Sequence, residues 1–171
     1  MICDVRLFRS AWMDYLTAKK IYDVPYNDEM YLNNAAYHLQ QCVEKTLKGA
    51  LECVGITVPN MYKITKLIDM IRHHGSPLII TEWLDDHSEM LSSWEAETRY
   101  NMDFVVEKRK LDTAIREIAS YLEINGIRET LREELSDSDR RRKLLLCLPE
   151  SRRNCTDFEL NCYYLMFQKK L

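Results

Sequence analysis

The chain has 171 residues, of which 30% are charged, a formal net charge of −3, and only 4 glycines and 4 prolines. So few turn-forming residues mean that long helices must carry most of the length, which excludes collagen-like, disordered and many-stranded β proteins. The negative net charge excludes a global positive field that would draw the protein onto nucleic acid or an anionic membrane.

The first two predicted helices lie on either side of Pro25. Apolar residues recur every three or four positions from Phe8 to Tyr22, which is typical of a helix with one buried face. A longer helix, about 39 Å in length, is predicted over residues 29–54. Gly49 lies inside this helix and predicts the close approach of another helix. The apolar positions of the second helix are Leu32, Ala35, Ala36, Leu39, Val43, Leu47, Ala50, Leu51 and Val54.

Three further helices are predicted before Asn125-Gly126. The third ends at Gly75, and Ser76-Pro77 is expected to open the fourth. His87 lies among the apolar residues of the fourth helix and is interpreted as a hydrogen-bonded core histidine. The five segments predict an all-α, up-and-down bundle of four to five long helices over residues 1–125. The residues expected to be buried include Leu39, Val43, Leu47, Ile68, Leu91, Ile115 and Ile118.

Residues 126–171 have a different character and are predicted to form a helical C-terminal extension that packs on the bundle or on a partner subunit. The basic run Arg140 to Lys143 is interpreted as solvated helix surface rather than a phosphate site, because acidic residues lie beside it and no aromatic residues are interleaved. Thr156 and Glu159 have the spacing of a capping box and predict the start of a last helix.

The sequence indicates no metal site and no cofactor. The six cysteines form no C-x-x-C pair, and the adjacent His73 and His74 would point about 100° apart on a helix. Cys42 and Cys53 fall on one helical face and are expected to be buried thiols. No apolar stretch approaches the roughly 20 residues that span a bilayer, and the N-terminus lacks a signal-peptide pattern. We therefore predict a cytoplasmic protein without a membrane partner.

A polar stripe follows the second helix at the spacing i, i+4, i+7, i+11. By spacing alone this stripe is solvated surface, with Glu44 and Lys48 as a favourable pair. However, the string from Ala36 to Leu51 resembles the A-x-x-x-x-Q-Q-x-x-E-K-x-L-K-x-x-L helix of the HEPN family ("higher eukaryotes and prokaryotes nucleotide-binding" domains). The stripe consists of Tyr37, Gln41, Glu44 and Lys48, with His38 and Lys45 alongside.

Two further segments resemble the same family. Arg99-Tyr100 is similar to the A-R-Y segment after its fourth helix, and the segments Gly55 to Pro59 and Thr65 to Leu67 are similar to its glycine-containing loop and third helix. The resemblance covers roughly residues 5–125. It implies a helical bundle, usually dimeric, from a bacterial or archaeal protein. Many members act beside a minimal nucleotidyltransferase or within toxin–antitoxin and defence systems.

A large subset of the family are metal-independent ribonucleases with an R-x4–6-H motif at the dimer interface, where the imidazole moves a proton and the arginine stabilises phosphorane charge. Here no histidine follows an arginine at that spacing: Arg99 precedes Asn101, Met102 and Asp103. Thr65 stands where the family frequently has a histidine.

The resemblance, without the ribonuclease motif, therefore implies a noncatalytic binding or regulatory module that forms a homodimer. Enzyme activity stays open but is the less favoured interpretation. Its expected ligand- or partner-binding residues are Tyr37, Gln41, Glu44, Lys45, Lys48, Arg99 and Tyr100. One alternative is a divergent ribonuclease toxin that uses Arg99 with His38 as the base. A second alternative is a nucleotide-binding partner of a separate nucleotidyltransferase. The possible ligands are a nucleotide or RNA, and the possible protein partners are a nucleotidyltransferase or an antitoxin.

Overall fold

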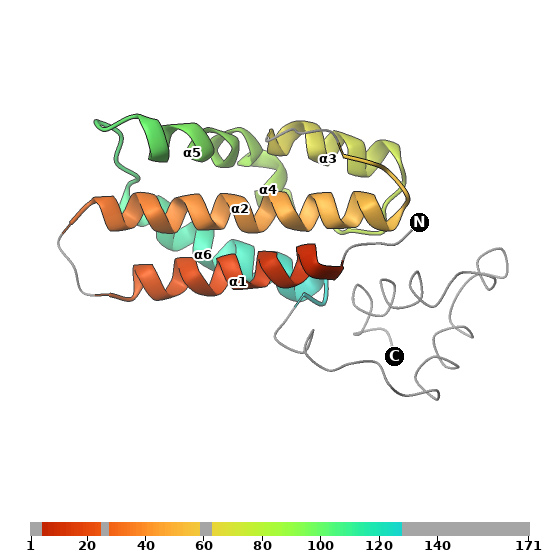
Figure 1. The fold of residues 1–171 in the computed structure, drawn as a ribbon, viewed down its shortest axis with the longest axis horizontal. Coiled ribbons are helices and arrows are strands. Elements are labelled where there is room, and N and C mark those ends of the chain that lie inside the picture. The colour runs from red at the N-terminus through yellow and green to blue at the C-terminus, as the bar shows by residue number, and fades with distance from the viewer. Residues whose placement is uncertain (1–4, 25–27, 59–62, 128–171) are drawn as a thin grey trace, which may run out of the picture.

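The computed structural model describes residues 5–24, 28–58 and 63–127, and every regular element in these ranges is a helix (Figure 1). The predicted all-α bundle is confirmed. The helix expected from Thr156, the run Arg140 to Lys143 and most of the predicted extension lie outside the described residues. The helices are α1 (Val5–Tyr22), α2 (Met30–Cys53), α3 (Ile64–His73), α4 (Glu82–Asp86), α5 (Ser88–Tyr100) and α6 (Lys108–Ile124).

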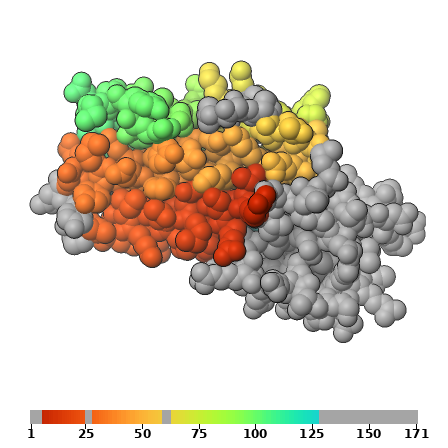
Figure 2. Space-filling model, viewed as in Figure 1, coloured from red at the N-terminus to blue at the C-terminus, as the bar shows by residue number. Residues whose placement is uncertain are grey.

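Helix α2 is the central element, because it contacts α1, α3, α5 and α6. In Figure 1, α1 lies along one side of α2, while α3 and α5 follow one another along the opposite side. Figure 2 shows the surface of α2 as a band between them. Only Met30 and Asn34 of this helix are exposed, and the residues after Asn34 are buried or half-buried. The polar residues of α2 therefore lie inside the bundle or at its seams, and the interpretation of the stripe as solvated surface is wrong.

The core is formed by apolar residues from all six helices, with Leu84 as the contribution of the short α4. Of the residues predicted to be buried, all are buried except Ile115, which is half-buried and packs against the core. Ile127 is also buried, so the chain remains part of the bundle for at least two residues beyond position 125. No helix in the described ranges is long and apolar enough to cross a membrane.

Gly49 marks a close helix contact, as the sequence predicts. A Cβ atom at this position would lie 3.1 Å from Cζ of Phe8 and 3.3 Å from Cβ of Leu7, both on α1. Phe8 is 1% exposed, so its ring has little room to move. The missing side chain at Gly49 is what lets α1 and α2 approach each other here.

Three helices end with the same hydrogen-bonded motif. At the ends of α2, α3 and α6 a glycine with positive φ is followed by a residue whose N–H bonds to the carbonyl five residues earlier. This is the Schellman arrangement, which satisfies carbonyls that the helix leaves free. It accounts for the glycine signals in the sequence, which are Gly55, Gly75 and Gly126.

The prediction of a single fourth helix that starts at Ser76-Pro77 is wrong, because the helical segment starts later and is divided in two. Residues 76–81 are not helical; α4 begins after Thr81, whose Oγ1 accepts the N–H of Leu84 at 3.3 Å. The reason lies in Asn125, whose side-chain amide holds both backbone groups of Ile79 at 2.8 and 2.9 Å and so keeps this segment extended. The remaining segment is divided into α4 and α5, which meet at His87.

A second asparagine fixes the loop between α5 and α6. The buried Asn33 donates from Nδ2 to the carbonyl of Phe104 at 2.6 Å and accepts the N–H of Val106 at Oδ1, 3.0 Å away. Because Asn33 belongs to α2, these bonds attach the loop to the central helix. They hold the end of α5, with Arg99 and Tyr100, beside the first half of α2.

We predict that Gly49→Ala lowers the free energy of unfolding by about 1 kcal/mol. Alanine favours the helix by about 1 kcal/mol, but overpacking against a confined ring typically costs 1–3 kcal/mol. Urea unfolding measures the difference. Asn34→Ala is the matched control, because this exposed position of the same helix gains helix propensity without new packing. If Gly49→Ala raised the free energy of unfolding as much as Asn34→Ala does, that result would contradict the close contact at Gly49.

Candidate functional site

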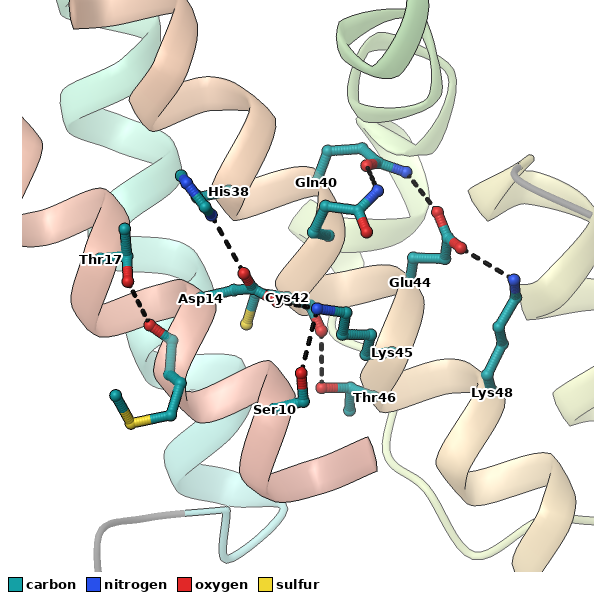
Figure 3. Close-up of polar contacts among 12 residues, drawn as sticks. Ser10, Asp14, Thr17, His38, Gln40, Cys42, Glu44, Lys45, Thr46 and Lys48 are labelled. Carbon is teal, nitrogen blue, oxygen red and sulfur yellow. Dashed lines mark hydrogen bonds and ion pairs between the residues drawn. The ribbon is translucent and has the colours of Figure 1, made fainter. Parts of the chain in front are cut away.

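Apart from Tyr37, the predicted polar residues of α2 belong to two separate hydrogen-bond networks, one on each side of the helix (Figure 3). Figure 3 shows His38 and Lys45 pointing toward α1, and Gln40, Glu44 and Lys48 pointing away from it. The sequence analysis grouped His38, Gln41, Glu44, Lys45 and Lys48 on one polar surface, whereas the packing of α2 between its neighbours separates them.

The first network connects α2 to α1 through Asp14. One carboxylate oxygen of Asp14 lies 3.0 Å from Nδ1 of His38, and the other accepts Nζ of Lys45 at 2.5 Å. Lys45 also donates to Oγ of Ser10 at 3.0 Å. A carboxylate only accepts hydrogen bonds, so Nδ1 of His38 carries the proton in this contact. The network fixes the imidazole and neutralises Asp14 at a half-buried helix interface.

The second network runs along α2 itself. Glu44 is 4% exposed, and its two carboxylate oxygens accept Nε2 of Gln40 and Nζ of Lys48, both at 2.8 Å. Gln41 donates to Oε1 of Gln40 at 2.7 Å. A buried carboxylate is tolerated when it is paired and hydrogen-bonded. These contacts give Glu44 the partners that its burial requires.

Arg99, Tyr37 and Tyr100 form a third group, at the end of α5. The guanidinium carbon of Arg99 lies 5.6 Å from the centre of the Tyr37 ring and 5.0 Å from that of Tyr100, which is the geometry of cation–π contacts. Arg99 also forms an ion pair with Glu95 at 2.9 Å. The Tyr37 ring meets the His38 ring edge-on at 5.5 Å. The structure thus brings together Tyr37, Arg99 and Tyr100, with His38 on the next position of α2.

This third group is the most exposed part of the predicted site. Tyr100 is 71% exposed and Met102 is 79% exposed, and the side chain of Arg99 is about half exposed. Gln41, Glu44, Lys45 and Lys48 are instead buried or half-buried. Arg99 and Tyr100 are therefore more accessible to a binding partner than these polar residues of α2.

Sequence reasoning missed three residues of the networks. Asp14 and Ser10 belong to α1, and only the packing of α1 on α2 shows that they face Lys45. Gln40 precedes Glu44 by four residues, a spacing at which side chains on a helix are neighbours. That spacing was an available signal for the Gln40–Glu44 bond.

His87 is hydrogen-bonded, as the sequence predicts, but it is not a core residue. It is half-buried, its ring stacks on that of Trp83 at 4.6 Å, and Nδ1 lies 2.9 Å from the Trp83 carbonyl oxygen. The break between α4 and α5 moves His87 toward the surface. His73 and His74 are both exposed, and the described residues include no group of three or more metal-ligating side chains.

The two described cysteines differ. Cys42 is a buried free thiol, as predicted, and burial raises its pKa well above the ordinary value, with a further contribution from the negative charge of Asp14. Cys53 is half-buried and disulfide-bonded, so the expectation of a buried free thiol is wrong there. Burial also raises the pKa of Tyr15 and of Tyr121. Cys42 is therefore an unreactive packing residue and not a candidate nucleophile.

Comparison with known families gives one finding. The model of the HEPN domain matches residues 6–139, which is most of the chain. No curated protein and no solved structure matches the chain.

We predict that Glu44→Ala lowers the free energy of unfolding by about 3 kcal/mol, because it removes the carboxylate that Lys48 and Gln40 share in a buried network. Chemical unfolding followed by circular dichroism measures this loss. Glu95→Ala is the matched control: Glu95 forms the same i,i+4 pair with Arg99, but in a more exposed setting worth about 0.2–1 kcal/mol. Equal losses in the two variants would contradict a structural role for the second network.

We also predict that stability falls at alkaline pH. The folded state keeps the Cys42 proton, whereas the unfolded state releases it above about pH 8.5. The unfolded state then binds fewer protons, so the free energy of unfolding falls by up to about 1.4 kcal/mol per pH unit as pH rises. Unfolding measured from pH 7 to 9.5 should show this slope, and Cys42→Ala should flatten it. An unchanged slope in that variant would show that another group is responsible.

Proposed function

The chain belongs to the HEPN domain family, and on this premise we propose that it is a noncatalytic binding and regulatory module that forms a homodimer. Membership in the family implies a nucleotide-binding or ribonuclease-type module. Of the binding module and the ribonuclease, the contacts of the described residues favour the noncatalytic binding module.

The observation that supports this choice is the internal pairing of the family motif. The carboxylate of Glu44 is occupied by Gln40 and Lys48, and Lys45 is bound to Asp14 and Ser10. A group that moves protons or stabilises charge on a substrate must reach the reacting atoms. The motif residues reach each other instead, so they serve the packing of the bundle.

Arg99 supports a binding role for the exposed group. Its guanidinium is held by Glu95 and lies near two tyrosine rings, one of which is largely exposed. Exposed aromatic and arginine side chains are enriched at protein interfaces. Met102 and Val105 add exposed apolar surface a few residues further along the chain. We propose that this end of α5 forms the homodimer contact.

The finer parts of the proposal come from the family resemblance. We propose that the module is bacterial and assists a nucleotidyltransferase, or acts in a toxin–antitoxin or defence system with an antitoxin partner, and that its ligand is a nucleotide or RNA. The proposal includes a cytoplasmic location. Disulfides are rare in that compartment, so the Cys53 disulfide is the described feature that fits the location least.

A divergent ribonuclease is the second candidate. Tyr37 contacts both Arg99 and His38, and the Asp14 carboxylate orients His38 as such groups orient catalytic imidazoles. Against this candidate, Arg99 is already paired with Glu95, and Asp14 is shared with Lys45. The segment from Asn101 to Glu107 supplies no histidine.

We predict no metal-independent RNA cleavage by the purified protein. A well-placed acid/base group typically contributes 10²- to 10⁴-fold to the rate, and this chain has none at the family position. The assay uses a labelled single-stranded RNA in the presence of a chelator, at up to micromolar protein. Robust cleavage that both His38→Ala and Arg99→Ala abolish would establish the ribonuclease instead.

We predict a dimer mass by light scattering at micromolar concentration. Tyr100→Asp combined with Met102→Asp should shift the protein toward the monomer, because it places charge in an apolar contact. Ile124→Asp is the control, since Ile124 is also exposed and apolar but lies at the far end of α6, about 25 Å from its start. A monomer in the unmodified protein, or equal effects of the two changes, would refute the proposed contact.

A further inference from the structure

The outward face of α1 carries positive charge that its neighbours do not balance. Arg9 and Lys20 are exposed, and no carboxylate of the described residues lies within ion-pair distance of either. The acidic residue of this helix, Asp14, is held at the α2 interface by Lys45. In a chain with a net charge of −3, this face attracts a negatively charged occupant.

The same face also exposes apolar surface. Met13 is 50% exposed and lies one turn after Arg9, and the half-buried Leu16 follows one turn later. Residues at this spacing are neighbours on one side of a helix. A polyanion without apolar groups would leave the Met13 side chain in water. The surface therefore suits a segment that is both acidic and apolar.

The described chain ends close to the start of this face. Helices α1 and α6 contact each other, and Tyr22 in the last turn of α1 donates to Asp112 in the second turn of α6 at 3.4 Å. Figure 1 shows the two helices running in opposite directions, with the start of α1 and the end of α6 at the same end of the bundle. The buried Ile127 therefore leads the chain toward the first turns of α1.

The sequence that follows, residues 128–139, has the composition that this face requires. It contains five acidic residues and two arginines, whereas residues 140–171 contain eight basic and three acidic residues. At helical spacing, Leu131, Glu134 and Leu135 share one side. Twelve helical residues measure about 18 Å, and the face from Arg9 to Lys20 about 16 Å. The family match also ends at residue 139, where the excess charge changes sign.

We propose that residues 128–139 form an amphipathic helix that binds the outward face of α1. Leu131 and Leu135 contact the apolar part of this face, and Glu134 lies toward Arg9. The basic residues that follow cannot take this place, because like charges repel. The bundle then extends to residue 139, and the contact does not rest on the noncatalytic function proposed above.

The test measures hydrogen–deuterium exchange of residues 128–139 in the full chain by mass spectrometry. This segment should exchange more slowly than an unstructured peptide of the same sequence. Arg9→Glu alone and Glu134→Arg alone should each speed its exchange roughly twofold to tenfold, because repulsion replaces an exposed ion pair. The two changes together should restore most of the protection, a result that general destabilisation would not give.

Two control variants locate the contact. Glu133→Arg makes the same change one residue earlier, at a position about 100° away around a helix, and should affect the exchange less than Glu134→Arg does. Lys66→Glu reverses an exposed cation on α3, which lies on the other side of α2 from α1 (Figure 1), and should leave the exchange unchanged. Circular dichroism checks that each variant remains folded.

The proposal is overturned if residues 128–139 exchange as fast as the peptide, if the combined variant is no better protected than the single ones, or if Arg9→Glu and Lys66→Glu have equal effects. Protection that falls on hundredfold dilution would also overturn it, because the segment would then cover α1 of a partner subunit. The RNA cleavage and light-scattering tests do not depend on this contact, so either proposal can fail while the other survives.

Discussion

The structure depends on the enclosure of α2 by four other helices. A helix in that position has almost no solvated face, so each polar side chain on it must find a partner within the bundle. Glu44 finds Gln40 and Lys48 on its own helix, while Lys45 and His38 find Asp14 on α1. The residues that identify the family are therefore those that let a polar helix occupy the centre of the molecule.

This arrangement leaves the accessible polar groups of the proposed site at the periphery of the bundle. The motif is satisfied internally, whereas Arg99 and Tyr100 at the end of α5 and Arg109 at the start of α6 remain accessible. Asn33 fixes the loop that joins these two helix ends to α2, through its bonds to Phe104 and Val106. The central helix thus positions the ends of α5 and α6 relative to each other.

The sequence predicted the helices better than it predicted the partners of their polar side chains. Helical periodicity and the glycines at helix ends defined α1, α2, α3 and α6, because both are local properties. The start of α4 was wrong because Asn125, 46 residues away from Ile79, holds that segment extended. The residues alongside the stripe on α2 were misread for the same kind of reason: Asp14, the partner of His38 and Lys45, lies on another helix, and spacing along one helix carries no information about it.

The most direct test of this account is a double-mutant cycle between Asp14 and Lys45, measured as the free energy of unfolding without any ligand. Asp14→Asn, Lys45→Met and the double variant give the coupling between the two side chains, free of their separate effects. If the motif supports the bundle, the coupling is about 1 kcal/mol or more. A coupling near zero, with both single variants as stable as the unmodified protein, would contradict the account and return these residues to a ligand-binding role.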